Sequence, residues 1–434
     1  MPMKIKPVLL RTAAAVSGSI KDHSPAAIRR YSWNGLHRLI SDGVSLRLMT
    51  TDGTAWLTWG MLAVEQGEAF DIILDSARFN SLIAKCSEGN LFTISRSENQ
   101  IAFSQNPLVL RLREESPQEY PEPAAMVVNH TFEASAERVA ASLNFVQAFV
   151  DTTNTAAPKK VLTWFPSGII TGGQLKRVAV IQGCPRTPHF ISMLQKTARS
   201  VVSFLKALPG QVRIDLGDTA MILTCTTDRH QLRVGIEPVE YPALAINLSN
   251  QGEEIFRVDR ASFLAAVEIL IAVLPPSQER LNLRICGIGS AASIQLSTMG
   301  DRNRCSQDEV AIIRQAAVDG VPLDPQPEAL PECWLGVMAK FLKTALVEAE
   351  SVYLDVEVFS RRKLIRISEV VDTPEALKRQ LLLSVVLTTP EEAAIEPVEA
   401  PPSPTPTPAA AIPAEEEPSP AEPEEVESDS LENM

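Results

Sequence analysis

The sequence predicts an α+β protein that consists of three repeated domains followed by an acidic tail. Three observations predict this: a repeat at an offset of 121 residues, helices that alternate with runs of antiparallel strands, and a change of composition after residue 390. The chain has 434 residues, 45% of them hydrophobic, which is enough for two to four domains with their own cores.

The repeat rests on identical residues at one offset. Glu119-Tyr120-Pro121 recurs as Glu240-Tyr241-Pro242. The same offset joins Ala77-Arg78 to Ala198-Arg199, Lys85 to Lys206, Gly89 to Gly210 and Ile101 to Ile222. So many ungapped matches are not expected by chance and indicate a duplicated unit of domain size. We predict domains at 1–124, 125–250 and 251–390, although the third lacks the closing Tyr-Pro.

Each predicted domain contains two helices separated by strands. The six helices are expected to begin near Lys6, Ser76, Ser135, Ser192, Asp259 and Cys333. Alternating or β-branched runs predict strands at 45–49, 91–95, 100–103, 108–112, 212–216, 220–225, 281–285, 293–297, 352–359 and 364–367. Turn residues at 97–99 and 216–218 predict hairpins between neighbouring strands.

The second helix of each predicted domain carries a short basic stripe. With a step of about 100° per residue, the cations of 192–208 gather on one side and the apolar residues on the other. Similar stripes occur in 76–87 and 333–347. The residues concerned are Arg78, Lys85, Lys196, Arg199, Lys206, Lys340 and Lys343. A solvated helix face would explain any one stripe, but recurrence in three helices favours sequence-independent contact with phosphates.

The net charge of −13 comes from the tail alone. Residues 391–434 contain 13 acidic residues, 10 prolines and no basic residue, which leaves 40 acidic and 40 basic residues in 1–390. The tail has too few apolar residues to offset chain entropy, so we expect it to be disordered. It acts as a spacer, repels DNA or carries a partner motif; the sequence leaves these alternatives open.

Several other classes of protein are not favoured. The sequence has no apolar run long enough to span a membrane and no secretory signal, so we expect a cytoplasmic protein. The six cysteines and five histidines show no metal-ligand spacing, so no metal or other cofactor is expected. No phosphate loop, nucleophile elbow or HExxH motif is present, so we predict no catalytic residues and no enzyme activity.

Several stretches of residues 1–390 share the order of a known family. Over 70–123, DSARFNSLIAKCSEGNLFTISRSENQIAFS and RLREESPQEYPEP give a helix, a hairpin and a closing aromatic-proline. MTTDGTAWLTW (49–59) places a Thr-Asp before an alternating strand, and 173–179 precedes the closing Tyr241-Pro242. In this order, residues 1–390 resemble the bacterial DNA polymerase III beta sliding clamp family; the resemblance is strongest over 70–123, and 173–179 with Tyr241-Pro242 resembles the family's middle domain.

The resemblance implies a ring made by a head-to-tail dimer, with helices lining the hole and antiparallel sheets outside. The seven basic residues would face duplex DNA, and water-separated phosphate contacts would let the ring slide. The dimer contact would join an edge strand with Leu110 and Leu112 to the third domain near Ile269 and Leu270.

The resemblance also implies a groove between the second and third domains for peptides of a DNA polymerase and a clamp loader. By position, its lining residues would be Leu162, Val180, Gln182, Gly183, Pro242, Ile246, Val385, Val386 and Leu387. VAVIQGCPR (178–186) replaces the family's Ala-Thr-Asp-Gly-His-Arg-Leu-Ala run, and SVVL (384–387) replaces its terminal Met-Pro-Met strand. The peptide specificity should therefore differ from that of the family.

Two functions remain open at this point. The first is a DNA sliding clamp, a processivity factor that encircles duplex DNA and tethers a replicative polymerase. The second is a clamp-derived interaction or scaffold protein that no longer slides on DNA.

Overall fold

The structure is a computed structural model, in which Met1–Ala394 forms one compact unit. It describes residues 1–20, 32–97, 100–113, 120–150, 161–174, 177–225, 227, 229–239, 254–274, 279–286, 293–298, 307–313, 334–359, 363–370, 376–384 and 386–388. The acidic segment 391–434 lies outside the described residues.

The order of elements repeats three times as strand, helix, three strands, strand, helix, three strands. The first repeat contains β1 (Met3–Ile5), α1 (Pro7–Ile20), β2 (Leu36–Asp42), β3 (Ser45–Thr51), β4 (Ala55–Leu62), β5 (Ala69–Asp75), α3 (Ser76–Ala84), β6 (Phe92–Ser97), β7 (Gln100–Gln105) and β8 (Leu108–Arg113), with a 3-10 turn η1 (Ser32–Gly35) before β2. The second contains β9 (His130–Ser135), α4 (Ala136–Gln147), β10 (Val161–Trp164), β11 (Ile170–Gln174), β12 (Arg177–Gln182), β13 (Ile191–Leu194), α5 (Gln195–Lys206), β14 (Gln211–Leu216), β15 (Ala220–Thr224) and β16 (Gln231–Gly235).

The third repeat has the same order and one additional strand. It contains β17 (Glu254–Asp259), α6 (Arg260–Val273), β18 (Arg280–Cys286), β19 (Ser293–Thr298), β20 (Gln307–Ile313), β21 (Trp334–Met338), α7 (Ala339–Glu348), β22 (Tyr353–Phe359), β23 (Leu364–Glu369) and β24 (Lys378–Ser384), followed by β25 (Val386–Thr388). The predicted α+β architecture with three repeated units is confirmed. The domain boundaries at 124/125 and 250/251 stay predictions, because Met1–Ala394 is one unit.

The six α-helices in the described part of the chain correspond to the six predicted ones, but two begin later than expected. Residues 191–194 and 334–338 form β13 and β21, which pair with β10 and β18 and lead into α5 and α7. The predicted helix starts at Ser192 and Cys333 are therefore wrong. Short apolar runs such as ISML and WLGVM fit a buried strand as well as a helix, and here sheet pairing decides.

Side-chain caps fix the start of three helices. The carboxylate of Asp75 accepts a hydrogen bond from the N–H of Arg78, and Asp259 caps Ser262 in the same way. The hydroxyl of Ser135 accepts from the N–H of Arg138. Each cap satisfies an N–H group that the first helical turn leaves without a partner.

The described strands form three antiparallel sheets, two of which cross from one repeat into the next. The first has the order β1-β6-β7-β8, and the second has the order β5-β2-β3-β4-β16-β15-β14-β9. The third has the order β13-β10-β11-β12-β24-β23-β22-β17-β20-β19-β18-β21-β25. The pairs β4–β16 and β12–β24 join the first repeat to the second and the second to the third.

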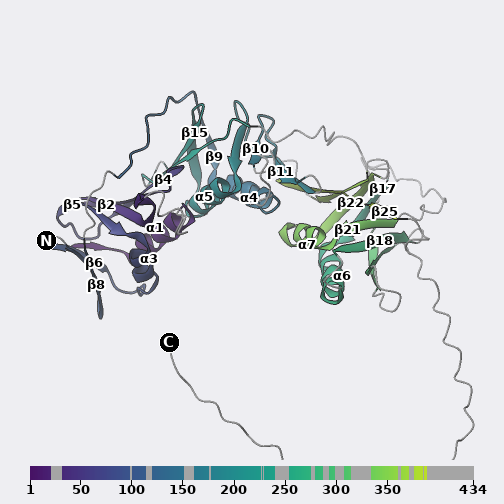
Figure 1. The fold of residues 1–434 in the computed structure, drawn as a ribbon, viewed down its shortest axis with the longest axis horizontal. Helices are drawn as coiled ribbons and strands as arrows, with labels where there is room; N and C mark the ends of the chain where they lie inside the picture. The colour runs from purple at the N-terminus through teal and green to yellow at the C-terminus, as the bar shows by residue number, and fades with distance from the viewer. Residues whose placement is uncertain are drawn as a thin grey trace, which may run out of the picture. The chain divides into compact units, whose positions relative to one another are not determined.

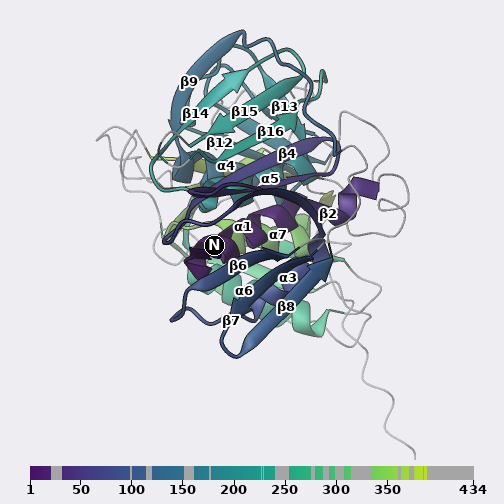
Figure 2. The same ribbon diagram turned by 90° about the vertical axis from the view of Figure 1, so that its left-hand side faces the viewer.

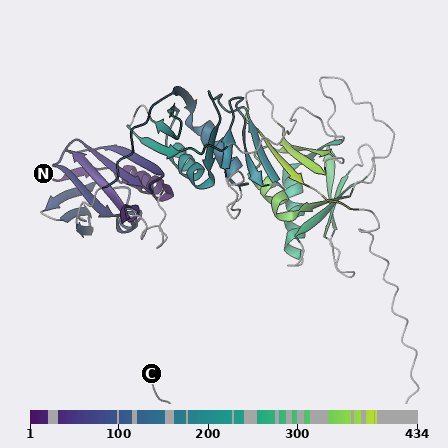
Figure 3. The same ribbon diagram turned by 45° about the horizontal axis from the view of Figure 1, so that its top comes forward.

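The helices pack on one face of these sheets. In the second repeat α4 and α5 lie side by side, as do α6 and α7 in the third (Figure 1). Figure 2 shows β6, β7 and β8 adjacent to α3, and Figure 3 shows the helices of the third repeat on one side of its strands. One apolar core runs between helices and strands and includes Trp59, Phe103, Phe204 and Phe263. The opposite face of the sheets is therefore the outer face.

The offset of 121 residues holds for the helices but not for the strands after them. Phe79 and Ile83 of α3 are buried, as are Ser200 and Phe204 at this offset in α5. In the strands, buried Ile101 matches Ile222, which is only half-buried and alternates with buried Met221 and Leu223. The identity of Ile101 and Ile222 is thus coincidental, because a shift of one residue changes the face of the sheet.

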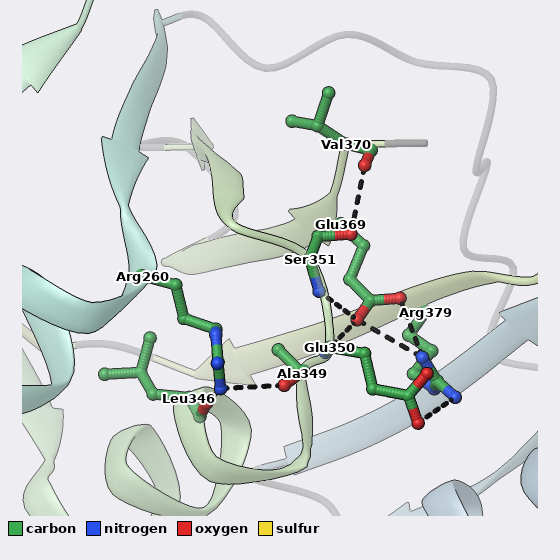
Figure 4. Close-up of polar contacts among 8 residues, drawn as sticks. All are labelled: Arg260, Leu346, Ala349, Glu350, Ser351, Glu369, Val370 and Arg379. Atoms are coloured by element: carbon green, nitrogen blue, oxygen red, sulfur yellow. Dashed lines mark hydrogen bonds and ion pairs between the residues drawn. The ribbon is translucent and has the colours of Figure 1, made fainter. Parts of the chain in front are cut away.

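A buried ionic cluster stabilises the end of the third repeat (Figure 4). The Glu369 carboxylate accepts hydrogen bonds from the N–H groups of Glu350 and Ser351 and lies 3.3 Å from the Arg379 guanidinium. Arg379 also pairs with Glu350 at 2.8 Å. Glu369 and Arg379 are 4% and 7% exposed, so their buried charges are compensated by these contacts within the cluster.

Candidate DNA-facing helices and partner groove

The cations of the three second helices lie on exposed faces. Arg78, Lys85, Arg199, Lys206 and Lys340 are exposed and form no ion pair with the residues that the structure describes. Lys85 follows the last residue of α3, and Lys206 ends α5. Neither α3 nor α5 contains an acidic residue, so these faces carry positive charge that a polyanion can neutralise.

Two of the seven predicted cations have carboxylate partners instead. Lys196 Nζ lies 2.6 Å from Asp52 Oδ2, and Lys343 Nζ lies 2.9 Å from Glu268 Oε1 of α6. Burial of the Asp52 carboxyl alone would raise its pKa, but hydrogen bonds from Lys196 and from the N–H groups of Thr54 and Ala55 outweigh burial and lower the pKa below its ordinary value. The charges of Lys196 and Lys343 are therefore partly compensated within the chain.

The first helix of each repeat uses its arginine differently. Arg11 of α1 pairs with Glu88 at 2.7 Å. Arg138 of α4 donates through Nε to the carbonyl of Gly183 at 2.8 Å. Arg260 of α6 donates to the carbonyls of Leu346 and Ala349 at the end of α7. These guanidinium groups stabilise the chain itself, so the exposed cations belong to the second helices.

Lys206 lies at a cavity between the second and third repeats. The cavity measures about 410 Å³ and is lined by Phe145 of α4, Lys206, Glu348 and Arg379, among others. Burial raises the pKa of Glu348, and the nearby Arg379 and Lys206 offset only part of that rise. Lys206 thus lies close enough to the carboxyl of Glu348 for their charges to interact.

The predicted groove residues lie on two faces of the sheet. Val161, Val178, Val180 and Leu382 form a small apolar cluster on the outer face. Leu162 pairs with Gly172, Gly172 with Ala179, and Ala179 with Leu381, so these residues share one face of the sheet. This is the opposite face, and Leu162 belongs to the main core. The structure thus brings Val180 together with Val161 and not with Leu162. The four cluster residues are 2–3% exposed, so they form a covered apolar patch here.

Gln182 and Gly183 lie where the third repeat approaches β12. The Gln182 amide is 3.5 Å from the amide oxygen of Gln380 in β24. Gly183 has a φ of +87°, and a Cβ added to it would lie 3.0 Å from the carbonyl oxygen of Ala376. Glycine is therefore required at this point for both its conformation and its size.

The remaining predicted groove residues are only partly placed. Pro242, Ile246 and Val385 lie outside the described residues. Val386 and Leu387 belong to β25, which pairs with β21 through Val386↔Gly336 and Leu387↔Leu335. The strand of the third repeat that pairs with β12 is β24, which ends at Ser384. The backbones of Val386 and Leu387 therefore pair with β21 at the end of the third repeat, and not with β12.

The predicted dimer residues divide into exposed and buried members. In β8, Leu108 and Val109 are 40% and 62% exposed, Leu110 is partly buried, and Leu112 is 4% exposed. In α6, Ile269 is 58% exposed while Leu270 is 1% exposed. Leu112 and Leu270 contribute to the core of their own repeat, so Leu110 and Ile269 are the predicted members that another chain could contact. Leu108 and Val109, which precede Leu110 in the run LVL, are more exposed than either predicted residue of β8.

Two further observations limit the chemistry of the described residues. They contain no group of three His, Cys, Asp or Glu side chains that could hold a metal ion. None of the helices among them is long and apolar enough to cross a membrane.

Comparisons with known proteins identify the fold. No family model matches the sequence, and no curated protein matches it. Solved structures do match. The chain superposes on the DNA polymerase III beta subunit of Thermotoga maritima with a TM-score of 0.75 at 11% identity, which covers 89% of this chain and all of that one. The Pseudomonas aeruginosa beta subunit gives 0.71 at 13% identity, with 89% and 100% covered.

A third match carries a ligand. The Helicobacter pylori beta clamp bound to a DNA ligase peptide gives a TM-score of 0.70 at 13% identity and again covers 89% of this chain and 100% of that one. The similarity extends over the three repeats, and the identity is too low to carry residue roles across. This chain has the fold of the bacterial DNA polymerase III beta clamps.

Proposed function

We propose that the protein is a DNA sliding clamp, a non-enzymatic, cytoplasmic replication factor. Two copies associate head to tail, enclose duplex DNA without sequence preference, and hold a polymerase at an outer groove. A clamp loader opens the ring. The domains of each subunit are 1–124, 125–250 and 251–390, followed by the acidic tail 391–434.

The observation that carries this proposal is the repeated junction between repeats. At the first junction β4 pairs with β16, and at the second β12 pairs with β24. Each time, the last of the three strands that follow the first helix of one repeat pairs with the last strand of the next repeat. The strands left over are β20 and β8. Among the described residues, β8 pairs only with β7, and β20 over 307–311 pairs only with β19.

A second copy can satisfy both free edges at once. If β8 of one copy pairs with β20 of the other, the same junction is formed a third time, and a two-fold arrangement closes the assembly. Pairing also covers an exposed apolar edge strand, which is otherwise an aggregation hazard. At the first junction α5 approaches α1, where the Ser200 hydroxyl donates to the carbonyl of Ser19 at 3.0 Å. By the same relation, α6 with its exposed Ile269 would contact α3 of the other copy.

The charges of the second helices support DNA as the occupant of the ring. Arg78, Arg199 and Lys340 come from equivalent helices of the three repeats and are exposed. Cations without neighbouring base-reading groups bind phosphates in any sequence, as a sliding protein requires. Lys85 and Lys206 add to this face, whereas Lys196 and Lys343 contribute less because each has a carboxylate partner.

The outer face of the β12–β24 junction is the proposed polymerase site. It carries the Val161, Val178, Val180 and Leu382 cluster, bordered by Gln182 and Gly183. The Helicobacter pylori clamp of the same fold is described with a DNA ligase peptide, which supports peptide binding as a property that this fold can have. Of the other groove residues expected from the sequence, Leu162 lies in the core on the opposite face and Val386 and Leu387 pair with β21, so the proposed surface does not include them. Pro242, Ile246 and Val385 lie outside the described residues.

Cysteine cross-linking tests the closure directly. One cysteine replaces Val109 in β8, and a second is placed in turn at positions 307 to 311 of β20, with Cys286, Cys305 and Cys333 replaced by serine. We expect disulfide-linked dimers at every second position, because alternate residues of a strand point to the same face. A protein that dimerises but forms none of the five cross-links would contradict this closure.

One observation favours the alternative of a scaffold protein that no longer slides. Lys196 and Lys343 are paired with carboxylates, and Glu348 lies near Lys206, so the positive potential is lower than the sequence suggests. Ring closure without retention on DNA would identify this alternative.

A further inference from the structure

The first junction between repeats contains a cavity on its outer face. Trp56 and Thr58 of β4 and Arg233 of β16 line it, together with Tyr120, Pro123, Ala124 and Ala125. Its volume is about 200 Å³. Leu57 and Leu232, which alternate with these residues, point into the core on the helix side. The cavity therefore lies on the side of the sheet turned away from the helices.

This position is equivalent to the apolar cluster at the second junction. At the first junction Trp56 pairs with Arg233 next to the core pair Leu57↔Leu232. At the second, Val178 pairs with Leu382 next to the core pair Ala179↔Leu381. Trp56 and Arg233 thus occupy the places of Val178 and Leu382. Where the second junction has a covered aliphatic patch, the first has an indole ring, a guanidinium group and an open space beside them.

Arg233 has no carboxylate partner among the residues that the structure describes. Its guanidinium donates to the carbonyl of Ala124 and lies 5.8 Å from the centre of the Trp56 ring, but its buried Nε has no hydrogen-bond partner in that part of the chain. Two other arginines on the outer face of the same sheet are paired, Arg38 with Asp71 and Arg213 with Asp215. A half-buried guanidinium without an anion retains an uncompensated desolvation cost.

The walls of the cavity are fixed by the fold. The Tyr120 hydroxyl donates to the carbonyl of Met49 at 3.1 Å, and Tyr120 is 9% exposed. Trp56 is held by pairing on both sides, with Thr51 of β3 and Arg233 of β16. Tryptophan, tyrosine and arginine together are the residue types that contribute most to binding at protein interfaces. The space is thus formed before any ligand arrives.

We infer that this cavity is a second docking site, specific for a peptide of another protein that presents an aromatic or large aliphatic side chain next to a carboxylate. The volume is below the roughly 300–1,000 Å³ of small-molecule sites, so it accommodates one side chain. The carboxylate completes the hydrogen bonding of Arg233, and the apolar group packs on Trp56. The site does not depend on ring closure or on DNA.

The probe for this site is 4-phenylbutyrate, which carries a ring and a carboxylate, and the matched neutral compound is its amide. The full chain is labelled with 5-fluorotryptophan, and the signal of Trp56 among the five tryptophans is assigned with the Trp56→Phe variant. We expect the acid to shift the Trp56 fluorine signal saturably and to bind roughly five-fold more tightly than the amide, because the charged hydrogen bond is absent from the latter.

Variants separate the charge from the shape of the site. Arg233→Gln should remove the difference in affinity between the acid and the amide, whereas Arg233→Lys should keep part of that difference. Arg213→Gln makes the same change on the same sheet, at a residue that has its own carboxylate partner, and should leave both affinities unchanged. The other tryptophan signals report whether each variant is folded.

Three results would overturn the inference: no saturable shift of Trp56, equal affinity for acid and amide, or an unaltered preference in Arg233→Gln. Retention on DNA is measured in parallel and should not change in Arg233→Gln. A protein that fails to encircle DNA but binds the acid selectively would refute the proposed function and leave this site standing.

Discussion

Lys196 Nζ of α5 lies 2.6 Å from Oδ2 of Asp52, a residue of the turn between β3 and β4. The two residues are 144 positions apart and belong to different repeats. The Asp52 side chain is 4% exposed, and its other hydrogen bonds come from the N–H and hydroxyl groups of Thr54 and the N–H group of Ala55. The pair therefore joins the first repeat to the helix face of the second, next to the β4–β16 strand pair.

Removing the charge of Asp52 should weaken this junction. We expect Asp52→Asn to lower the free energy of unfolding by about 1–2 kcal/mol at pH 7, since the half-exposed ammonium of Lys196 loses the charge of its buried acceptor. Urea unfolding measures the change. Asp71→Asn, which alters the more exposed pair with Arg38, is the control and should cost less.

The same carboxylate predicts the acid dependence of stability. The pKa of Asp52 is lower in the folded chain than its ordinary value, so its contribution is complete above about pH 4 and is lost as the pH falls through the lower folded pKa. The stabilities of the wild-type protein and of Asp52→Asn should converge below about pH 4 in urea titrations. A difference that stays constant down to pH 2 would show that the ionised form of Asp52 is not what matters.

Charge reversal should locate the DNA-facing surface. Arg78→Glu with Arg199→Glu should reduce the slope of log affinity against log salt by about one for each contact removed. Filter binding or fluorescence anisotropy with duplex DNA at several salt concentrations gives the slope. Arg47→Glu with Arg213→Glu makes an equal change on strand positions that alternate with core residues, and it should leave the slope unaltered. Equal effects of the two double substitutions on the slope would contradict the assignment of the DNA-facing surface to α3 and α5.

A charge on the β8 edge should separate the two subunits. Val109 is 62% exposed in the free edge strand, and Val109→Asp would place an unpaired carboxylate in the proposed pairing surface. We expect the dissociation constant of the dimer to rise at least about ten-fold, which sedimentation equilibrium measures. Leu62→Asp changes a residue of similar exposure, 72%, in a strand whose edge already pairs with β16, and it should have no such effect.

Gly183 tests the contact between β12 and the third repeat. Gly183→Ala should destabilise the chain by about 1–3 kcal/mol, because it adds steric contact with the Ala376 carbonyl to the cost of a positive φ. Gly53 has nearly the same φ, +88°, but nothing within 4 Å of an added Cβ. The difference in melting temperature between Gly183→Ala and Gly53→Ala therefore isolates the steric part. Equal melting temperatures would show that Ala376 adjusts freely.

Much of the fold could be predicted because it depends on local signals. Helices with a side-chain cap, such as those after Asp75, Ser135 and Asp259, begin within a residue of their predicted starts. Helices α5 and α7 have no side-chain cap, and their starts were misplaced. The exposure of Arg78, Arg199 and Lys340 follows from helical periodicity alone.

The parts of the site that could not be predicted depend on long-range pairing. Leu162 was assigned to the groove, but the register of β10 turns Val161 outward, and a shift of one residue reverses the face. Val386 and Leu387 pair with β21, which no local pattern indicates. Likewise, the sequence places Lys196 on a basic stripe but cannot reveal that Asp52 lies beside it.

Topological retention on DNA tests the central proposal most directly. A dimer cross-linked between β8 and β20 in the presence of a nicked circular plasmid should stay bound in about 1 M NaCl, where the Debye length is only about 3 Å. Linearising the plasmid with a single double-strand cut should release the cross-linked dimer. Release from the intact circle in high salt, or equal retention on circular and linear DNA, would contradict the account.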